Sequence, residues 1–275
     1  MKKLTIILLS LLLLTNTSYS QNNLLKSGNN LIKVGNNLIG IPFNQYSMLF
    51  DGVDEQISFG DISELDGVTN FTITGWAKQP VLDVESGIWQ KWLDTDNRIT
   101  MVTWSDGKMY VEFGTTNGNF DYSTVISANQ WFSYAVVYNG GGAANSDRLK
   151  IYINAANQTL TFPGTIPSTS GDNAAEPFRL GVYNVGAQRK YWKDNLDENA
   201  IWSNSFTQSE ITEFHNKGKP TNLLKHSASS SLVEWLRMGD GATWDGSNWT
   251  IPGKKGNYSG TSINIEFSDK VTDVP

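Results

Sequence analysis

The chain contains no cysteine among its 275 residues. This absence excludes disulfide bonds, thiolate metal sites, cysteine nucleophiles and lipid attachment through an N-terminal cysteine. Histidine is almost as scarce, with two residues, and charged residues make up only 17% of the chain. Without disulfides, the stability of the fold must come from a large apolar core, and a chain of this length can bury one.

Positive charge is also in short supply. There are 21 Lys and Arg residues against 27 Asp and Glu residues, which gives a formal net charge of −6 at pH 7. Nucleic-acid binding needs clustered basic side chains that neutralise phosphates, so a nucleic-acid partner is not expected. Glycine and aromatic residues are abundant instead, with 25 Gly and ten Trp. Low charge combined with many glycines and aromatic residues is typical of a β-rich surface module.

The N-terminus carries the one long apolar run of the sequence. Lys2 and Lys3 precede an apolar stretch over 4–14, and small polar residues follow before Gln21. This order predicts a cleaved secretory signal over residues 1–20, so we expect a secreted or cell-surface protein. The run is shorter than the roughly 20 apolar residues of a transmembrane helix. We therefore expect no membrane span once the signal is removed.

A seven-residue repeat occupies most of residues 21–45. Its three copies are NNLLKSG, NNLIKVG and NNLIGIP. Adjacent leucines do not fit the a/d spacing of a coiled coil, whereas the Asn pairs and the glycines that close the first two copies favour short extended pieces joined by turns. Two interpretations stay open: a flexible linker, or a strand-forming arm that docks on a partner.

Residues 46–220 show a period of two. Apolar and polar residues alternate in short segments that are separated by turns rich in Gly and Asn, which is typical of a β-sandwich. We predict an all-β fold with two antiparallel sheets. The expected strands include residues 56–59, 71–74, 99–104, 110–113, 131–138, 149–153, 178–183 and 196–202.

One short helix is expected near the end of this domain. Thr207 and Glu210 have the spacing of a capping box, in which each side chain satisfies a free backbone N–H group. Ile211 and Phe214 then lie on one face of the helix, and Gly218 predicts its end. Residues 221–275 form a β-rich C-terminal tail, which we expect to pack on the sandwich or on a neighbouring subunit.

Several of these segments resemble a known family. The series SMLFDGVDEQISFG, FTITGWAK, QWFSYAVVYNGG, LKIYINA and DNLDENAIWSNSFTQSEITEFHNKG is similar to the laminin-G-like jelly rolls of the concanavalin A-like lectin/glucanase superfamily. The resemblance covers about residues 46–218 and implies a jelly-roll sandwich. The tail resembles an appendage of marine phage and bacterial members. Asn154-Ala155 stands where the family usually has Asn-Gly, and Asp194-Asn195 replaces a usual glycine.

Enzymatic activity is not expected from the sequence. Glucanases with this fold need a Glu-x-Asp-x-x-Glu strand, which is absent, and the neighbouring Asp197 and Glu198 point to opposite faces of a strand. FRLGVYNVG is similar to a strand of alginate lyases, in which Tyr183 would be the catalytic tyrosine. Those lyases also need a Gln-x-His strand, whereas His215 and His226 are expected in the helix and the tail.

A carbohydrate site is the first binding hypothesis. Sugars have flat apolar C–H faces, which stack on aromatic rings, and hydroxyl rims, which amide and charged side chains bind. We predict a platform at strand ends and loops, against the alternative that these residues pack a loop over an edge strand. The predicted residues are Trp104, Tyr183, Asn184, Arg189, Tyr191 and Trp192.

Calcium is the second binding hypothesis. Members of the superfamily often join the first and closing strands through one calcium ion. By that resemblance, the ligands would be Asp51, the carbonyl of Gly52 and Asp197, since calcium prefers carboxylate and carbonyl oxygens. The alternative is that Asp51 starts a turn and Asp197 caps one.

Three functions therefore compete at this stage. The favoured hypothesis is an exported, non-catalytic carbohydrate-binding or adhesion protein, stabilised by calcium, whose partner is a glycan or polysaccharide. The alternative is a structural or interaction component of a virion or cell-surface assembly, with a protein partner. The least favoured is a polysaccharide lyase. A shared fold does not decide among them.

Overall fold

The structure is a computed structural model with two compact units, residues 1–43 and 44–275. It describes residues 31–34, 37–40, 43–173, 175–185 and 188–275. The predicted signal over residues 1–20 lies outside the described residues. In the first unit, β1 (Leu31–Val34) and β2 (Asn37–Gly40) pair antiparallel. These strands come from the second and third copies of the seven-residue repeat.

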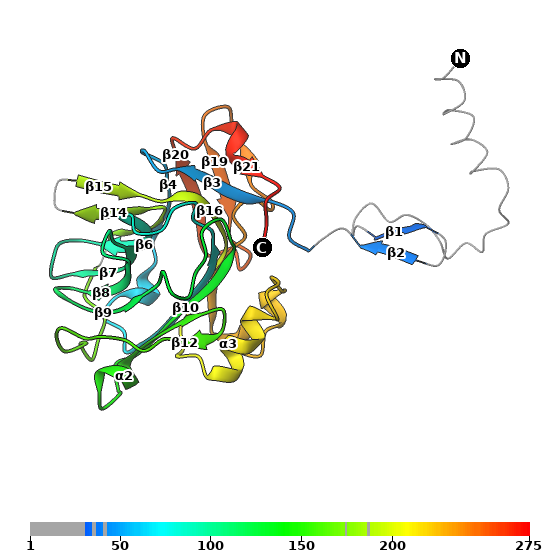
Figure 1. Ribbon diagram of the computed structural model, residues 1–275. Helices are drawn as coiled ribbons and strands as arrows, with labels where there is room; N and C mark the ends of the chain where they lie inside the picture. The colour runs from blue at the N-terminus through cyan, green and yellow to red at the C-terminus, as the bar shows by residue number, and fades with distance from the viewer. Residues whose placement is uncertain (1–30, 35–36, 41–42, 174, 186–187) are drawn as a thin grey trace, which may run out of the picture. The chain divides into compact units, whose positions relative to one another are not determined.

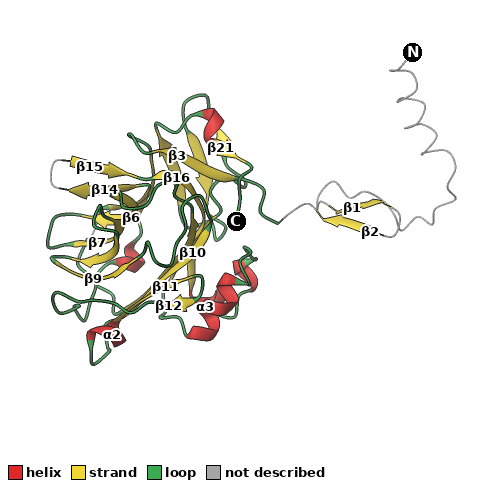
Figure 2. Ribbon diagram, in the orientation of Figure 1, coloured by secondary structure: helices red, strands yellow, loops and turns green. Residues whose placement is uncertain are grey.

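The second unit is a sandwich of two antiparallel sheets (Figures 1 and 2). β17 (Leu232–Leu236) pairs with β16 beside the main path of the eight-stranded sheet. That path runs β12 (Ala156–Asn157), β11 (Leu149–Ile153), β10 (Phe132–Asn139), β5 (Asn70–Ala77), β16 (Lys193–Trp202), β3 (Ser47–Asp51) and β21 (Lys270–Val271).

The second sheet of the sandwich has nine strands. Its order is β18 (Thr243–Trp244), β19 (Trp249–Pro252), β20 (Ser259–Ile263), β4 (Gln56–Asp61), β13 (Pro177–Leu180), β6 (Ser86–Trp92), β7 (Arg98–Thr103), β8 (Lys108–Phe113) and β9 (Thr116–Asp121). A separate hairpin consists of β14 (Val182–Val185) and β15 (Gln188–Tyr191). The predicted all-β sandwich is confirmed.

The core lies between the two sheets and follows from the period of two. On β5, Phe71 and Ile73 belong to the core, whereas Thr72 between them faces outward. Phe113 of the nine-stranded sheet stacks on Tyr138 of the eight-stranded sheet, with their ring centroids 4.7 Å apart. Burial of these apolar faces stabilises the fold by roughly 25 cal/mol for each Å² removed from water.

A helix covers the outer face of the eight-stranded sheet. α3 (Gln208–His215) begins at the predicted capping box, in which the Glu210 carboxylate accepts the Thr207 N–H at 2.7 Å. Its buried residues Ile211 and Phe214 belong to a second apolar cluster with Trp76 of β5. Figure 1 shows α3 beside β10 and β12. The predicted helix is confirmed.

The remaining helices are short. The sequence did not predict α2 (Asn145–Arg148), which forms in the connection between β10 and β11. No helix in the described part of the chain is long and apolar enough to cross a membrane. The 3-10 helices are η1 (Ser63–Leu65), η2 (Leu223–Lys225), η3 (Ser229–Ser231) and η4 (Phe267–Asp269).

Residues 221–275 contribute strands to both sheets. β17 pairs with β16 and β21 with β3 in one sheet, whereas β20 pairs with β4 in the other. Glu234 on β17 is fully buried. Its carboxylate accepts backbone N–H groups from Trp235, Lys255, Asn257 and Tyr258, at 2.6–3.0 Å. This carboxylate ties the loop before β20 to the opposite sheet.

Candidate functional site

A row of polar side chains crosses the outer face of the nine-stranded sheet. The strand register places Arg179 opposite Gln90, Gln90 opposite Thr100, and Thr100 opposite Glu112. Residues directly opposite one another share a face of the sheet. The intervening residues, such as Met101, belong to the apolar core. The polar row therefore lies on the face that points away from the core.

Four aromatic rings gather on the same face. Trp104 lies 6.4 Å from Tyr110 and 6.1 Å from Tyr183 between ring centroids, with an interplanar angle of 72° in both pairs. Trp92 meets Tyr183 edge-on at 5.7 Å. The guanidinium of Arg98 lies 4.5 Å above the Trp92 ring, within the range of a cation–π contact. The edge-to-face arrangement is one that aromatic quadrupoles favour.

The β14–β15 hairpin brings Tyr183 onto this face. The backbone of Val182 passes so close to Gly87 of β6 that a Cβ added there would lie 2.3 Å from the Val182 carbonyl carbon. A residue without a side chain is therefore required at that crossing. The N–H of Asn184 then donates to Oε1 of Gln90 at 2.9 Å. Together, the close approach and the hydrogen bond hold the hairpin over β6.

Glu112 is the buried charge of the face. Its Oε2 accepts hydrogen bonds from the hydroxyls of Tyr183 at 3.0 Å and Thr100 at 3.1 Å, and it lies 3.0 Å from Nε of Arg98 in an ion pair. Burial raises the pKa of Glu112, while these three partners lower it in part. Burial also raises the pKa of Tyr183, and the charge of Glu112 adds to that effect. Tyr183 is therefore a protonated donor.

A hollow opens beside these rings. It has a volume of about 330 Å³, and the Tyr110 hydroxyl donates to the Asp106 carboxylate at 2.6 Å on its wall. The lining residues are Trp104, Ser105, Asp106, Tyr110, Glu112 and Asn117. From here on, the aromatic face means the set Trp92, Arg98, Trp104, Tyr110, Glu112 and Tyr183.

The structure separates the six predicted glycan-binding residues into three groups. Trp104 and Tyr183 meet on the aromatic face. Asn184, Arg189 and Tyr191 lie on the adjacent hairpin, where Asn184 pairs with Arg189. Trp192 is fully buried in the core between the sheets, so it has no surface for a sugar. The assignment of Trp192 to the platform was wrong, because the sequence placed it in a loop.

Sequence reasoning missed four residues of the aromatic face: Trp92, Arg98, Tyr110 and Glu112. Tyr110 and Glu112 belong to the expected strand 110–113, and alternation already places them on one face of it. Trp92 and Arg98 lie outside the expected strands. The missing information was the order of strands in the sheet. That order places Glu112 beside Tyr183, although the two are separated by 71 positions in the chain.

The three predicted calcium ligands do not form one site. Asp51 pairs with Lys193 on β16, and Asp197 lies four residues further along that strand, roughly 13 Å away at the usual rise per residue. Calcium–oxygen distances are about 2.3–2.6 Å, so one ion cannot bind Asp51 or Gly52 together with Asp197. The buried Asp197 carboxylate accepts a hydrogen bond from Nδ2 of Asn44 at 2.6 Å.

Acidic ligands are not clustered elsewhere either. Within residues that the structure describes, no three His, Cys, Asp or Glu side chains are close enough to hold a metal ion. The expectation that Asp51, Gly52 and Asp197 together bind one calcium ion is therefore corrected.

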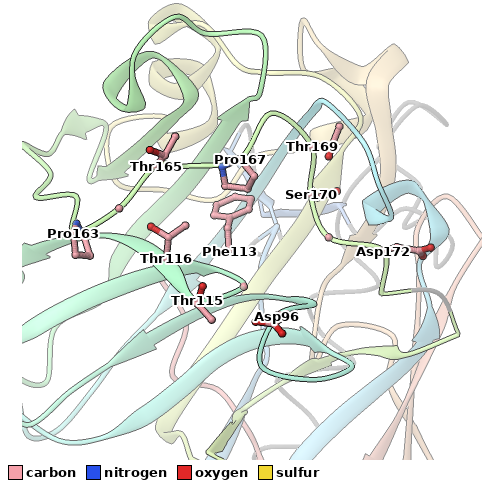
Figure 3. Close-up of a pocket in the computed structure, with 13 residues that line it drawn as sticks. Asp96, Phe113, Thr115, Thr116, Pro163, Thr165, Pro167, Thr169, Ser170 and Asp172 are labelled. Atoms are coloured by element: carbon pink, nitrogen blue, oxygen red, sulfur yellow. The ribbon is translucent and has the colours of Figure 1, made fainter.

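A second hollow lies at the rim, beside the turn between β8 and β9 (Figure 3). Its volume is about 680 Å³, and threonine, serine, proline and glycine residues form most of its wall. Figure 3 shows Phe113 between Pro167 and Thr116, but Phe113 is only 3% exposed and belongs to the core. This rim hollow offers hydroxyl groups without a stacking surface, so the aromatic face is the better candidate.

The family of the chain follows from a match to a family model. The model described as the concanavalin A-like lectin/glucanases superfamily matches residues 51–212, more than half of the chain. The chain belongs to this superfamily. The matched range of this superfamily member includes the strands that carry the aromatic face and ends within α3. A search of curated protein sequences gives no match.

Solved structures of other proteins resemble this chain to different degrees. A Bacteroides ovatus protein provisionally described as carbohydrate-binding matches with a TM-score of 0.58 and 15% identity, over 82% of this chain and 60% of its own length. Domain 4 of the arabinanase AbnA from Geobacillus stearothermophilus, solved with arabinotriose, matches with a TM-score of 0.46 and 22% identity, over 61% of this chain and 75% of that one. At these identities, the likeness shows the fold alone.

Proposed function

We propose that this superfamily member is an exported, non-catalytic protein that binds a carbohydrate on the aromatic face, for recognition or adhesion. The observation that carries the proposal is the arrangement of rings around the hollow of about 330 Å³. Trp104 meets Tyr110 and Tyr183 at 72°, and Trp104 and Tyr110 both keep part of their surface exposed. Aromatic rings fixed by one another can receive a ligand without further ordering.

The chemistry of the hollow fits a sugar. The C–H face of a pyranose is apolar and can stack on Trp104, while its hydroxyls reach acceptors at the edge of the ring. Asp106 and Asn117 line the hollow and supply such acceptors. Hydrogen bonds to carboxylates are roughly twice as strong as those between neutral groups. Stacking on the rings would therefore bury the apolar face of the sugar, and hydrogen bonds to the acidic and amide side chains would orient it.

The same contacts favour binding over catalysis. A tyrosine that removes a proton from a sugar would need a lowered pKa, whereas the pKa of Tyr183 is raised and its hydroxyl donates to Glu112. Glu112 already has three partners and is 7% exposed. A retaining glycosidase would need two free carboxyl groups about 5 Å apart.

The comparisons support the carbohydrate part of the proposal. The family is described as lectin- and glucanase-like, and the Bacteroides ovatus protein is provisionally described as carbohydrate-binding. The export part rests on the charged and apolar pattern of residues 1–20.

Affinity electrophoresis through gels that contain single polysaccharides tests the proposal. The wild-type chain should be retarded by at least one polymer, and Trp104→Ala should remove most of that retardation. Phe267→Ala is the matched control, because Phe267 is an aromatic residue that is 65% exposed and stacks on Trp249 outside the aromatic face. Equal retardation of wild type and Trp104→Ala, with loss in Phe267→Ala, would reject the site.

A further inference from the structure

Gln90, Arg179 and Arg189 occupy neighbouring positions beside the aromatic face. Arg179 on β13 pairs with Gln90 on β6. The backbone of Asn184 donates to the Gln90 side chain, and Asn184 pairs with Arg189 across the hairpin. Both arginines therefore flank the single contact between Gln90 and Asn184. The strand register and the hydrogen bond together bring these three donors into one neighbourhood.

The Gln90 amide is the most constrained of the three. Its Oε1 accepts the Asn184 N–H at 2.9 Å. That bond fixes the orientation of the amide, because the flipped form would set two donors against each other. The side chain is fully buried, and its Nε2 has no hydrogen-bond partner in the described part of the protein. A buried donor without an acceptor is costly, and native structures rarely keep one without a reason.

The two arginines are also without direct acceptors. Among the described residues, neither Arg179 nor Arg189 makes a side-chain hydrogen bond or an ion pair. The nearby cation Lys190 differs, since its Nζ lies 2.7 Å from the Glu85 carboxylate. Burial lowers the pKa of Arg179, attraction to Glu176 raises it in part, and repulsion from Arg189 lowers it again.

Two neighbouring guanidinium groups are unexpected in a chain with a net charge of −6. Repulsion between the two guanidinium groups lowers the stability of the fold, whereas an anion bound between them would attract both groups. The planar guanidinium group presents paired N–H donors that match a carboxylate or a sulfate oxygen pair. Gln90 Nε2 would supply a further donor to the same group.

We propose that Gln90, Arg179 and Arg189 form a subsite for an anionic substituent of the bound glycan, the carboxylate of a uronic acid or a sulfate ester. The proposal rests on the proposed function and specifies its ligand as an acidic polysaccharide. Arg179 and Glu112 are separated by three inter-strand spacings, or about 14 Å. An oligosaccharide, not a single sugar, would span the subsite and the hollow beside Trp104.

Binding of three polymers tests the subsite: polygalacturonate for carboxylate, carrageenan for sulfate ester, and a neutral galactan. The wild-type chain should bind one of the acidic polymers most tightly, and added salt should weaken that binding, because salt screens charge attraction. The double variant Arg179→Gln/Arg189→Gln should lose about tenfold in affinity for the acidic polymer and keep its affinity for the neutral galactan.

Control variants distinguish the effect of lost net charge from the effect of losing charge at the subsite. Lys219→Gln/Lys225→Gln removes the same charge from exposed positions near α3 and should leave all three affinities unchanged. Arg189→Gln alone alters an exposed side chain on the hairpin, so a several-fold loss there tests the subsite even if the double variant unfolds. Arg179→Lys/Arg189→Lys keeps the charge without the paired donors and should restore binding only in part.

The results also distinguish failure of the anionic subsite from failure of the proposed carbohydrate-binding function. Equal binding of neutral and acidic polymers, with no effect of the double glutamine variant, would overturn the subsite and leave the aromatic face as a neutral-glycan site. Absence of binding to acidic and neutral polymers in a wider panel would reject the proposed function, and the subsite with it.

Discussion

The outer faces of the two sheets have opposite characters. On the eight-stranded sheet, Trp76, Val137 and Trp202 are buried beneath Ile211 and Phe214 of α3, in an apolar cluster. On the nine-stranded sheet, the corresponding outward positions carry Arg179, Gln90, Thr100 and Glu112 in register. Figure 2 shows the helix on one sheet and the hairpin at the other.

The two faces have different roles: the helix-covered face stabilises the fold, whereas the polar face carries the proposed binding surface. A face covered by a helix can be apolar, because its residues contribute burial free energy. A face left polar loses that contribution, and its charges must be satisfied in other ways. In this chain, the polar face concentrates its aromatic rings around a hollow. We therefore expect substitutions on the two faces to have separable effects, on stability for one and on binding for the other.

The largest expected effect is on the covered face. Trp202→Ala removes a fully buried indole that packs against Phe206, with ring centroids 4.7 Å apart, and donates to Thr74. The free energy of unfolding should fall by about 3–5 kcal/mol, as for other large-to-small core changes. Urea denaturation measures the loss. The folded fraction should bind glycan with unchanged affinity, and weakened binding per folded molecule would break the separation of the two faces.

A smaller loss of unfolding free energy is expected from a substitution of Glu234, whose carboxylate joins the two sheets. Glu234→Gln keeps the size of the side chain but sets an NH₂ group against backbone N–H donors of the loop at residues 255–258. Loss of such charge-assisted hydrogen bonds costs about 2–3 kcal/mol, again measured in urea. Asp54→Asn at an exposed position is the control. Equal stability of the two variants would show that the buried carboxylate does not secure the loop.

Substitutions on the aromatic face are expected to change the affinity for glycan and not the stability of the fold. Trp104→Ala should weaken glycan binding about thirtyfold, which corresponds to about 2 kcal/mol for a central aromatic residue. Its melting temperature should change little, because Trp104 is only partly buried. Calorimetric titration and thermal denaturation of the same samples measure both quantities. Strong destabilisation by Trp104→Ala would mean that this face is structural.

The last expected effect is a dependence of stability on pH. Burial raises the pKa of Glu55 to about 8, assisted by Asp269, and burial raises that of Glu198 to about 7 despite Arg237. A carboxyl whose pKa is higher in the folded state contributes stability that is complete below its unfolded pKa of about 4.5 and lost as the pH rises through its folded value. Stability should therefore fall between pH 5 and 9.

Urea titrations at pH 5, 7 and 9 measure this slope. Glu55→Gln should flatten it between pH 5 and about 8, because an amide does not titrate. A slope that is unchanged in this variant would assign the dependence to other groups. Neither Glu55 nor Glu198 belongs to the aromatic face.

Sequence patterns predicted the fold better than the site, for a physical reason. Alternation along one strand and the Thr207–Glu210 capping box are local signals, so the sandwich and α3 could be predicted. The site depends on register between strands that are distant in sequence. Trp192 is buried and Asp51 pairs with Lys193 because of that register. The hydrophobic pattern of a single strand carries no information about the register between strands.

The most direct test of the account uses the ten tryptophans as reporters. Indole N–H resonances, assigned through single Trp→Phe variants, are followed by NMR while an oligosaccharide of the bound polymer is added. We expect the indole signals of Trp92 and Trp104 to shift with saturation, while those of Trp76 and Trp202 under α3 stay in place. Shifts confined to tryptophans outside the aromatic face, with Trp92 and Trp104 unmoved, would contradict it.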